Sequence, residues 1–430
     1  MQTDSWVDIR CGNALEVLAE MPAESIDMCV TSPPYWSQRK YAGEQSVTWP
    51  DGSHEPYGLE KTVEAYIAHS LLFLSAIRRV LKPWGTCWWN IGDTRAGSWG
   101  SMSHDLDGKG KRQGYTTRPV SSYTDGNLKP LDMCLIPQRL VLAAQADGWY
   151  VRSMVAWVKN NPMPESVSSW RWEQHRIKVG AEWLLCPGCP KCSPNGGLVL
   201  RKGNWRPTDS YEYIIMLAKS DSYFCDQEAV REQLMATTLQ RNSYSRIPQQ
   251  GISADEYWAT ENTGIDFTDH EVTPNPVGRN LRDVWQFSTE GTKEKHFAAF
   301  PSELPRKCIM AGTSEAGVCS KCGLPVVRVV NHKNMEINRS GRAEDAGIRI
   351  MSSGTMTAEA ETQTLGWRPS CSCGAPSEPA TVLDLFCGTG TTLAVAKSLG
   401  RRSIGIDISE DYCRMSERKV EAVTVPMEFT

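Results

Sequence analysis

Hydrophobic positions divide the first ninety residues into alternating strands and helices. Ile26–Thr31 is a short apolar run that predicts a strand. Along Thr62–Leu81 the apolar residues recur at spacings of three and four, which predicts a helix with Thr62 as its N-cap. A second apolar strand is expected at Thr86–Ile91. This succession of elements is typical of an α/β fold.

The last fifty residues carry the clearest pattern of the chain. A strand is expected at Thr381–Phe386, a glycine turn at Gly388 and Gly390, a helix at Thr391–Leu399 and a strand at Ser403–Ile408. Such a βαβ unit places its loop at the carboxyl end of the first strand. Because a two-stranded sheet cannot stand alone, the N-terminal strands are expected to complete it. The sequence therefore predicts a circularly permuted domain.

The middle of the chain is less regular. Tyr211–Lys219 predicts a strand, and the apolar pattern that restarts at Tyr223 predicts a hairpin. Residues 94–130 are rich in Gly, Ser, Thr and Asp and include several basic residues. We expect a mobile loop there, either without a specific role or in contact with phosphates. Residues 232–280 are polar and lack periodicity.

Composition and charge exclude some classes of protein. Apolar residues make up 40% and charged residues 22% of the chain, as in a protein that buries a sizeable core. The net charge of −4 argues against a uniformly basic nucleic-acid-binding body but leaves a local basic groove open. Apolar runs fall far short of the roughly 18 residues of a membrane span, and the N-terminus lacks the features of a signal peptide. We therefore expect a cytoplasmic protein that does not bind membranes.

The glycine turn near the C-terminus has the features of a nucleoside site. Gly388 and Gly390 follow a strand, and Asp407 stands about 20 residues on, where an acid accepts hydrogen bonds from ribose hydroxyls. A dinucleotide site would have a third glycine where this chain has Leu393, and Asp384 would repel a pyrophosphate. The acidic loop favours the sulfonium and ammonium groups of S-adenosylmethionine over NAD or FAD. A simple tight turn is the alternative.

A second motif, Ser32-Pro33-Pro34-Tyr35, follows the strand Ile26–Thr31 directly. The two prolines lack an N–H and fix φ, so the neighbouring carbonyls become rigid acceptors for an amino group. Ser32 can accept a second hydrogen bond from that amino group, and Tyr35 offers a flat face for stacking. The alternative is that Pro-Pro only turns the chain. Its position at the carboxyl end of a strand favours a ligand site.

The two motifs, in this order, resemble the permuted β class of S-adenosylmethionine-dependent DNA amino-methyltransferases. Residues 11–14, 148–165, 206–213 and 296–304 resemble further segments of that family. Of these, 11–14 resembles the segment that contacts the adenine of the cofactor, and 296–304 the segment that wraps its methionine end. The resemblance implies a doubly wound α/β fold with a mostly parallel, seven-stranded, Rossmann-like methyltransferase sheet. It implies a catalytic core at 1–165, 205–317 and 375–430, with a target-recognition region within 232–280. The loop at 94–130, a Cys-rich insert at 166–204 and a zinc-ribbon-like insert at 318–374 depart from the minimal pattern of the family, and the cysteines of the last two predict zinc-binding inserts.

The resemblance also implies the roles of individual residues. Ser32, Pro33, Pro34 and Tyr35 would hold a base flipped out of double-stranded DNA and its amino group. S-adenosylmethionine would be bound by Asn13, Phe300, Pro301, Ser302, Asp384, Phe386, Gly388, Gly390, Thr391 and Asp407.

Four functions stay open on the sequence alone. A serine before Pro-Pro-Tyr is linked in this family to N4 of cytosine more often than to N6 of adenine, so we expect a cytosine-N4 enzyme of a prokaryote or phage, with a cognate restriction endonuclease as partner. Adenine N6 is the first alternative. Methyl transfer to RNA, protein or a small molecule, and a zinc-dependent DNA-binding protein with a degenerate core, are the others.

The insert at 318–374 contains two close pairs of cysteines. Cys319 and Cys322 are separated by two residues, and Cys371 and Cys373 by one. In a chain without a secretory signal, clustered cysteines indicate a metal-binding site rather than disulfide bonds. Two chelating pairs are what a tetrahedral structural zinc site requires, and free thiols are the alternative.

The insert at 166–204 contains three cysteines at regular spacing, Cys186, Cys189 and Cys192. A fourth zinc ligand is needed, and His175 is the first candidate, with Cys225 the second. An iron–sulfur cluster is disfavoured because the run lacks its fourth cysteine. The sequence therefore predicts two structural zinc ions.

Overall fold

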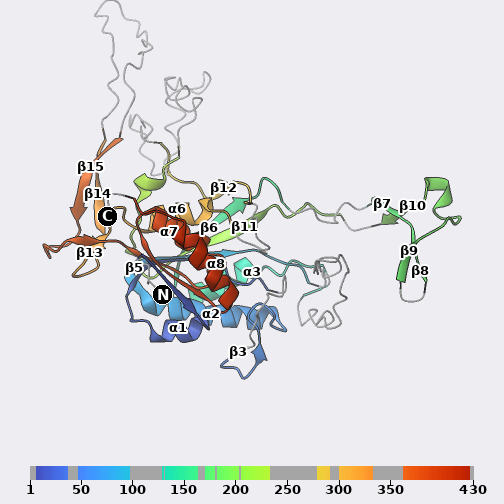
Figure 1. Ribbon diagram of the computed structural model, residues 1–430, viewed down its shortest axis with the longest axis horizontal. Helices are drawn as coiled ribbons and strands as arrows, with labels where there is room; N and C mark the ends of the chain where they lie inside the picture. The colour runs from blue at the N-terminus through green and yellow to red at the C-terminus, as the bar shows by residue number, and fades with distance from the viewer. Residues whose placement is uncertain are drawn as a thin grey trace, which may run out of the picture.

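The computed structural model describes residues 6–36, 47–96, 128–129, 131–162, 170–179, 182–202, 205–232, 278–290, 300–332 and 362–426. Most of the loop expected at 94–130, and nearly all of the target-recognition region expected within 232–280, lie outside the described residues. The central body is one large sheet with helices on both faces (Figure 1). None of the helices in the described ranges combines the length and the apolar character needed to cross a membrane.

Within the described residues the sheet has eight strands, all parallel except β11. Their spatial order is β1 (Val7–Cys11), β18 (Arg402–Asp407), β17 (Thr381–Asp384), β2 (Ile26–Thr31), β5 (Leu81–Ile91), β11 (Tyr211–Ala218), β6 (Tyr150–Val158) and β12 (Val284–Gln286). The circular permutation is confirmed, because the C-terminal strands β17 and β18 lie between the N-terminal strands β1 and β2.

Two sequence predictions about the sheet need correction. Seven strands were expected, and the short strand β12 adds an eighth beside β6. The strand β12 has three residues, of which only Trp285 is buried. So short a strand does not produce a recognisable alternation of apolar and polar residues in the sequence. The hairpin expected at Tyr211–Lys219 and Tyr223 is wrong, since β11 pairs with β5 and β6, and the chain after it forms the short 3-10 helix η2 (Gln227–Val230).

The strands in the middle of the sheet are buried on both faces. In β2 the side chain of Cys29 contributes to one core, and those of Met28 and Val30 contribute to the other. Burial on both faces requires consecutive apolar residues, which the sequence supplies at Met28, Cys29 and Val30. The first core is covered by α1 (Ala14–Glu20), α2 (Val63–Val80) and α3 (Ile136–Ala146), and the second by α6 (Glu303–Gly312) and α7 (Thr391–Ser398).

Helix ends agree with the capping signals in the sequence. The side chain of Thr62 accepts a hydrogen bond from the backbone N–H of Ala65 at 3.1 Å, so Thr62 is the N-cap of α2 as predicted. The last helix, α8 (Glu410–Glu421), packs through Val420 on α7 and β1. It follows the βαβ unit formed by β17, α7 and β18, whose first loop contains Gly388 and Gly390.

The two cysteine-containing inserts form small sheets of their own. The first has the antiparallel pairs β7–β10 and β8–β9 and lies apart from the main sheet (Figure 1). The second has the pairs β13–β16 and β14–β15. Their bounds are β7 (Trp170–Gln174), β8 (Arg176–Val179), β9 (Glu182–Leu185), β10 (Leu198–Lys202), β13 (Val318–Cys319), β14 (Val326–His332), β15 (Thr362–Pro369) and β16 (Ser377–Glu378).

Candidate active site and metal centres

The two sequence motifs lie side by side at the carboxyl edge of the sheet. Ser32 follows β2, the glycine loop follows β17, and these two parallel strands are neighbours. The hydroxyl of Thr31, the last residue of β2, donates a hydrogen bond of 2.7 Å to Oδ1 of Asp384, the last residue of β17. Motifs some 350 residues apart in the sequence therefore form one site.

Asp407 ends β18 beside the glycine loop. Its Oδ2 accepts the backbone N–H of Gly388 at 2.9 Å, and its Oδ1 accepts that of Ser409 at 2.9 Å. Burial raises the pKa of the Asp407 carboxyl to about 6. A carboxylate has about four acceptor positions, so the ionised group keeps capacity for ribose hydroxyls after these two bonds.

The glycine loop has a backbone that side chains would disturb. Gly388 and Gly390 have φ of 52° and 76°, in the left-handed region. A Cβ on Gly390 would lie 2.8 Å from the side-chain oxygen of Ser416 in α8. The next residue, Thr391, begins α7 and its hydroxyl accepts a hydrogen bond of 2.7 Å from Lys419. The loop is thus held tightly between two helices.

Asn13 is brought to the same edge by the outer strand. Cys11 at the end of β1 is in register with Asp407, and the N–H of Gly12 donates to the carbonyl of Asp407 at 2.9 Å. The side chain of Asn13 caps α1 by accepting the N–H of Leu15 at 2.9 Å. The expected adenine-contacting segment therefore lies next to the expected ribose acid.

Asp384 and Phe386 are built into the fold of the loop. Asp384 is buried, which raises the pKa of its carboxyl, and its Oδ1 also accepts the N–H of Phe386 at 3.2 Å. The ring of Phe386 packs 5.7 Å from that of Tyr57 and 5.2 Å from that of Phe73, measured between centroids. Their direct contact with a cofactor stays a prediction.

The expected methionine-end segment precedes α6. Phe300 packs against the core beneath this helix, and Pro301 is buried. Ser302 donates from its hydroxyl to Oε1 of Glu290 at 2.7 Å and from its N–H at 3.0 Å. The three residues have defined positions, and their cofactor contacts stay predictions.

Tyr35 is held by a polar network that spans three strands. Its hydroxyl donates to Oε2 of Glu212 at 2.7 Å and accepts from Nδ2 of Asn90 at 2.8 Å. The same amide nitrogen lies 3.3 Å from Oγ of Ser32, and Lys159 pairs with Glu212. The network fixes the serine and the tyrosine relative to each other.

The prolines are supported from the opposite side. The hydroxyl of Tyr66 in α2 donates to the carbonyl of Pro34 at 2.9 Å, and a Cβ on Gly58 would lie 3.0 Å from the Pro34 side chain. Beneath them, Glu60 is fully buried and its Oε1 lies 3.1 Å from Nδ1 of His69. These contacts hold the Ser32–Tyr35 segment in one conformation. A hydrogen-bond acceptor that has to orient an amino group needs such a fixed position.

Sequence reasoning gave no roles to Asn90, Lys159 and Glu212. Lys159 and Glu212 stand in segments that carry the family resemblance, but spacing along the chain does not show that they meet. Asn90 had a weak signal, since it is a polar residue inside the apolar strand β5, and it is 2% exposed. A buried amide needs partners, and here they are active-site groups.

Both cysteine clusters gather their expected ligands. The ligand atoms of Cys319, Cys322, Cys371 and Cys373 all lie within 4.8 Å of one another. The backbone N–H groups of Cys322 and Lys321 lower the pKa of the Cys319 thiol to about 6. The donor set and its spacing fit a tetrahedral zinc ion.

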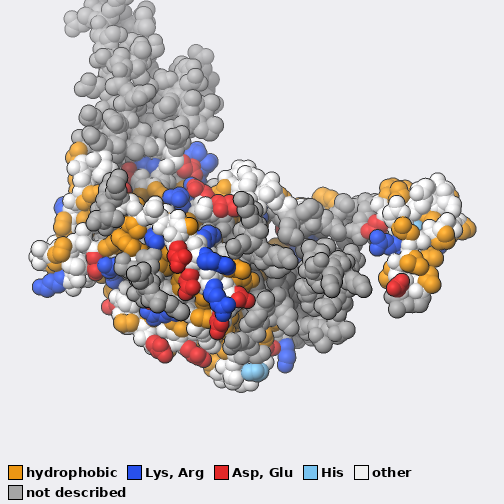
Figure 2. Space-filling model, in the orientation of Figure 1, with side chains coloured by type: hydrophobic (Ala, Val, Ile, Leu, Met, Phe, Trp, Pro, Cys, Tyr) orange, Lys and Arg blue, Asp and Glu red, His pale blue; other side chains and the backbone are white. Residues whose placement is uncertain are grey.

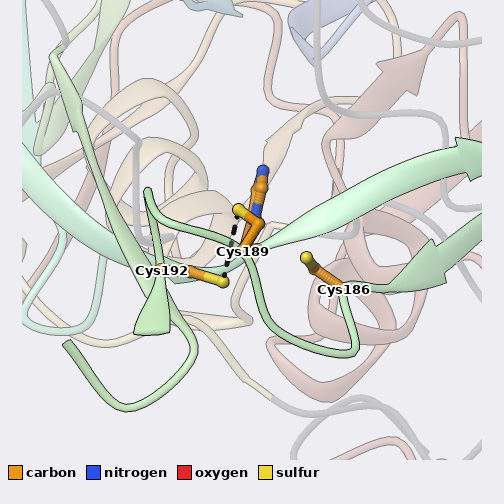
Figure 3. Close-up of side chains that lie close together, drawn as sticks. Cys186, Cys189 and Cys192 are labelled. Carbon is orange, nitrogen blue, oxygen red and sulfur yellow. Dashed lines mark hydrogen bonds between the residues drawn. The ribbon is translucent and has the colours of Figure 1, made fainter. Parts of the chain in front are cut away.

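The second cluster combines one histidine with three cysteines. The ligand atoms of His175, Cys186, Cys189 and Cys192 also lie within 4.8 Å of one another (Figure 3). Sγ of Cys189 is 3.3 Å from Nδ1 of His175 and 3.7 Å from Sγ of Cys192. His175, and not Cys225, is the fourth group of this cluster.

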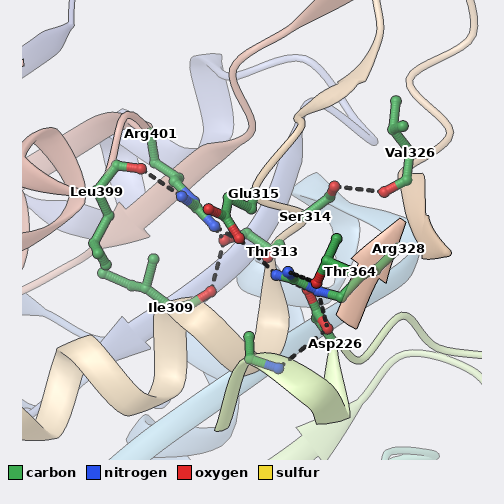
Figure 4. Close-up of polar contacts among 11 residues, drawn as sticks. Asp226, Ile309, Thr313, Ser314, Glu315, Val326, Arg328, Thr364, Leu399 and Arg401 are labelled. Carbon is green, nitrogen blue, oxygen red and sulfur yellow. Dashed lines mark hydrogen bonds and ion pairs between the residues drawn. The ribbon is translucent and has the colours of Figure 1, made fainter. Parts of the chain in front are cut away.

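The insert with four cysteines is tied to the core by ion pairs. Nη2 of Arg328 on β14 donates to Oδ2 of Asp226 at 2.9 Å and to Oε2 of Glu315 at 2.6 Å (Figure 4). Asp226 stands just before η2, and its N–H donates to the carbonyl of Ala311 in α6. Arg401 is buried nearby and donates to the hydroxyl of Thr313 at 3.1 Å. This insert therefore shares a polar anchor with the core.

Comparison with known proteins gives one consistent result. A family model described as DNA methylase matches residues 26–320 and 377–418. The type II methyltransferase M.Cfr9I of Citrobacter freundii is 32% identical over 70% of this chain and 71% of its own length. M.SmaI of Serratia marcescens is 26% identical over 96% and 90%. The solved structure of the PvuII DNA methyltransferase (cytosine-N4-specific) aligns with a TM-score of 0.46 and 14% identity, over 97% of this chain and 87% of the other.

Proposed function

Since the chain belongs to the DNA methylase family of S-adenosylmethionine-dependent amino-methyltransferases, we propose that it methylates N4 of cytosine in double-stranded DNA. The observation that carries this proposal is Ser32 before Pro33, Pro34 and Tyr35, held at the carboxyl edge by Asn90. The family resemblance links this serine to cytosine more often than to adenine.

The residues of the glycine loop fit S-adenosylmethionine. Asp407 would accept the ribose hydroxyls, with Asn13 on the adenine side and the loop from Gly388 to Thr391 beneath. The cofactor supplies an electrophilic methyl group when bound. Phe300, Pro301 and Ser302 would line its methionine end, and Asp384 and Phe386 would keep the loop in shape.

The chain's own residues would activate the target amine. Its lone pair is conjugated into the ring, and the base must leave the duplex to be reached. Ser32 Oγ and the Pro33 carbonyl would accept the two amino protons and turn the lone pair toward the methyl group. As the nitrogen becomes positive, the same oxygens stabilise that charge. Tyr35 would stack on the base, oriented by its bonds to Glu212 and Asn90.

Nucleoside mass spectrometry of DNA methylated by the protein tests the base assignment. We expect N4-methylcytosine, and N6-methyladenine alone would overturn the assignment to cytosine. Ser32→Ala should lower kcat by more than about a hundredfold, by loss of a preorganised acceptor, while S-adenosylmethionine affinity stays within twofold. Asn90→Asp tests the partner of Ser32, because it keeps the side-chain size but removes the amide N–H that lies next to the Ser32 hydroxyl.

Two zinc ions belong to the same proposal. The four-cysteine cluster and the cluster of three cysteines and one histidine each bring four ligand atoms together, the number that a tetrahedral zinc ion takes. Elemental analysis of protein purified without chelator should find about two zinc ions per chain. A value near zero would remove both sites.

We also propose a cognate restriction endonuclease and a prokaryotic cytoplasmic setting. The supporting observation is that the relatives are named type II methyltransferases of bacteria. DNA from cells that express this protein should resist an endonuclease that recognises the methylated sequence. Cleavage of fully methylated DNA by that endonuclease would contradict the pairing.

A further inference from the structure

The insert formed by β7 to β10 begins and ends at the active site. It is inserted between β6 and β11, and Val158 at the end of β6 is in register with Tyr211 at the start of β11. The N–H of Lys159 donates to the carbonyl of Ser210 at 2.8 Å, which closes the base of the insert. Lys159 directly follows β6 and pairs with Glu212, the second residue of β11, and Glu212 accepts the hydrogen bond from the Tyr35 hydroxyl.

The charge of this insert is opposite to that of the whole chain. Residues 166–204 contain six Lys and Arg against two Glu, a net charge of +4, whereas the full sequence has a net charge of −4. A zinc ion bound by three thiolates and a neutral histidine would not change the sign. A local excess of positive charge of this kind suits a polyanion.

The hairpin β8–β9 displays basic and apolar side chains together. Arg176 pairs across the strands with Leu185, and Lys178 pairs with Trp183. Residues directly opposite each other in an antiparallel pair share a face of the sheet, and i and i+2 lie on the same face. Arg176 and Lys178 are exposed, and Trp183 and Leu185 are each 60% exposed. Figure 2 shows apolar and basic side chains on the surface of this insert.

We propose that the β8–β9 hairpin of the Cys-rich insert is a DNA-contacting arm, which binds the duplex beside the flipped base. Duplex DNA on both sides of a base held at Tyr35 has to pass the edge from which the insert leaves. Arg176 and Lys178 would contact phosphates, and Trp183 would lie against the sugar–base edge of a groove. The inference rests on the DNA substrate of the family and not on which base is methylated.

The test is DNA binding and turnover of the full-length Arg176→Ala/Lys178→Ala double variant. The affinity for duplex DNA should fall about tenfold at moderate salt, and the slope of log affinity against log salt should decrease by about 2. The KM for DNA should rise, while kcat at saturating DNA stays within twofold. Arg402→Ala/Arg418→Ala is the matched control, because both residues are exposed and lie toward the amino edge of the sheet, and its DNA affinity should not change.

A second variant, Trp183→Ala, distinguishes DNA from a protein partner. It should weaken DNA binding with an unchanged salt slope, because it removes no charge. An unchanged affinity and salt slope in the double variant would overturn the proposal. So would a concentration-dependent dimer that Trp183→Ala abolishes while DNA affinity is kept, since the hairpin would then be a self-association surface. Loss of methyl transfer with normal DNA binding would count against the catalytic assignment and not against this arm.

Discussion

The two inserts have nearly the same donor chemistry but different relations to the core. The cluster at Cys319 belongs to an insert whose Arg328 pairs with the buried Asp226 of the core. The cluster at Cys189 belongs to an insert whose paired strands lie apart from the main sheet and whose hairpin displays large apolar side chains. From this difference we expect the Cys319 cluster to contribute to the stability of the catalytic fold, and the Cys189 cluster to affect only its own insert.

The largest effect should come from removing one ligand in each insert. Cys371→Ser should lower the free energy of unfolding of the core by on the order of 5 kcal/mol, because the proposed zinc at this cluster would couple its binding to folding. Cys189→Ser should change it by less than about 0.5 kcal/mol. Chemical denaturation followed by core tryptophan fluorescence measures both, with zinc content as the control. Equal losses in the two variants would erase the contrast.

Breaking the polar anchor should separate packing from metal binding. Arg328→Ala leaves Asp226, whose side chain is 4% exposed, without its charged partner. Removing one member of a buried pair costs about 3–5 kcal/mol. The exposed Arg176→Ala is the matched variant in the other insert and should cost less than about 0.5 kcal/mol. Arg328→Ala protein that keeps wild-type stability would show that the insert is not anchored through this pair.

Local patterns and family resemblance together predicted much of the fold and the site. The strand Ile26–Thr31, the cap at Thr62 and the permuted order follow from local patterns and from the need to complete a sheet. The groups that hold Tyr35 did not emerge in this way. Asn90 and Glu212 meet only because β5 and β11 are neighbours, and pairing between distant strands leaves no local signal.

The three-cysteine insert shows the same limit. Spacing gave the cysteines but left two candidates for the fourth ligand. His175 is chosen because its N–H bonds to the carbonyl of Gly197 and its carbonyl accepts from Cys186, which brings the end of β7 to the cysteine turn. The identity of the fourth ligand depends on strand register, which cannot be deduced from the spacing of the ligands along the chain.

Cofactor binding should be independent of the projecting insert. Asp407→Ala removes an acceptor for ribose hydroxyls and should weaken S-adenosylmethionine binding by about 1–3 kcal/mol. Cys189→Ser should bind the cofactor as tightly as the wild type, because Asp407 is held by Gly388 and Ser409 at the other end of the site. Isothermal titration calorimetry of both variants compares them directly. Unchanged affinity in Asp407→Ala would remove the ribose assignment.

The smallest effect should appear in the pH dependence of cofactor affinity. Burial raises the pKa of Asp407 to about 6, well above the ordinary value of an aspartate, and the ionised form is the better acceptor. Affinity should therefore fall as pH falls through 6, by about fourfold between pH 7.5 and 5.5. Stability moves the other way, because a raised carboxyl pKa makes this group's contribution to folding decrease as pH rises from about 4 to 6. The loss of affinity in acid is thus not unfolding driven by Asp407. The Asp407→Ala variant should lack this fourfold change, and a fall of the same size in that variant would assign the titration to another group.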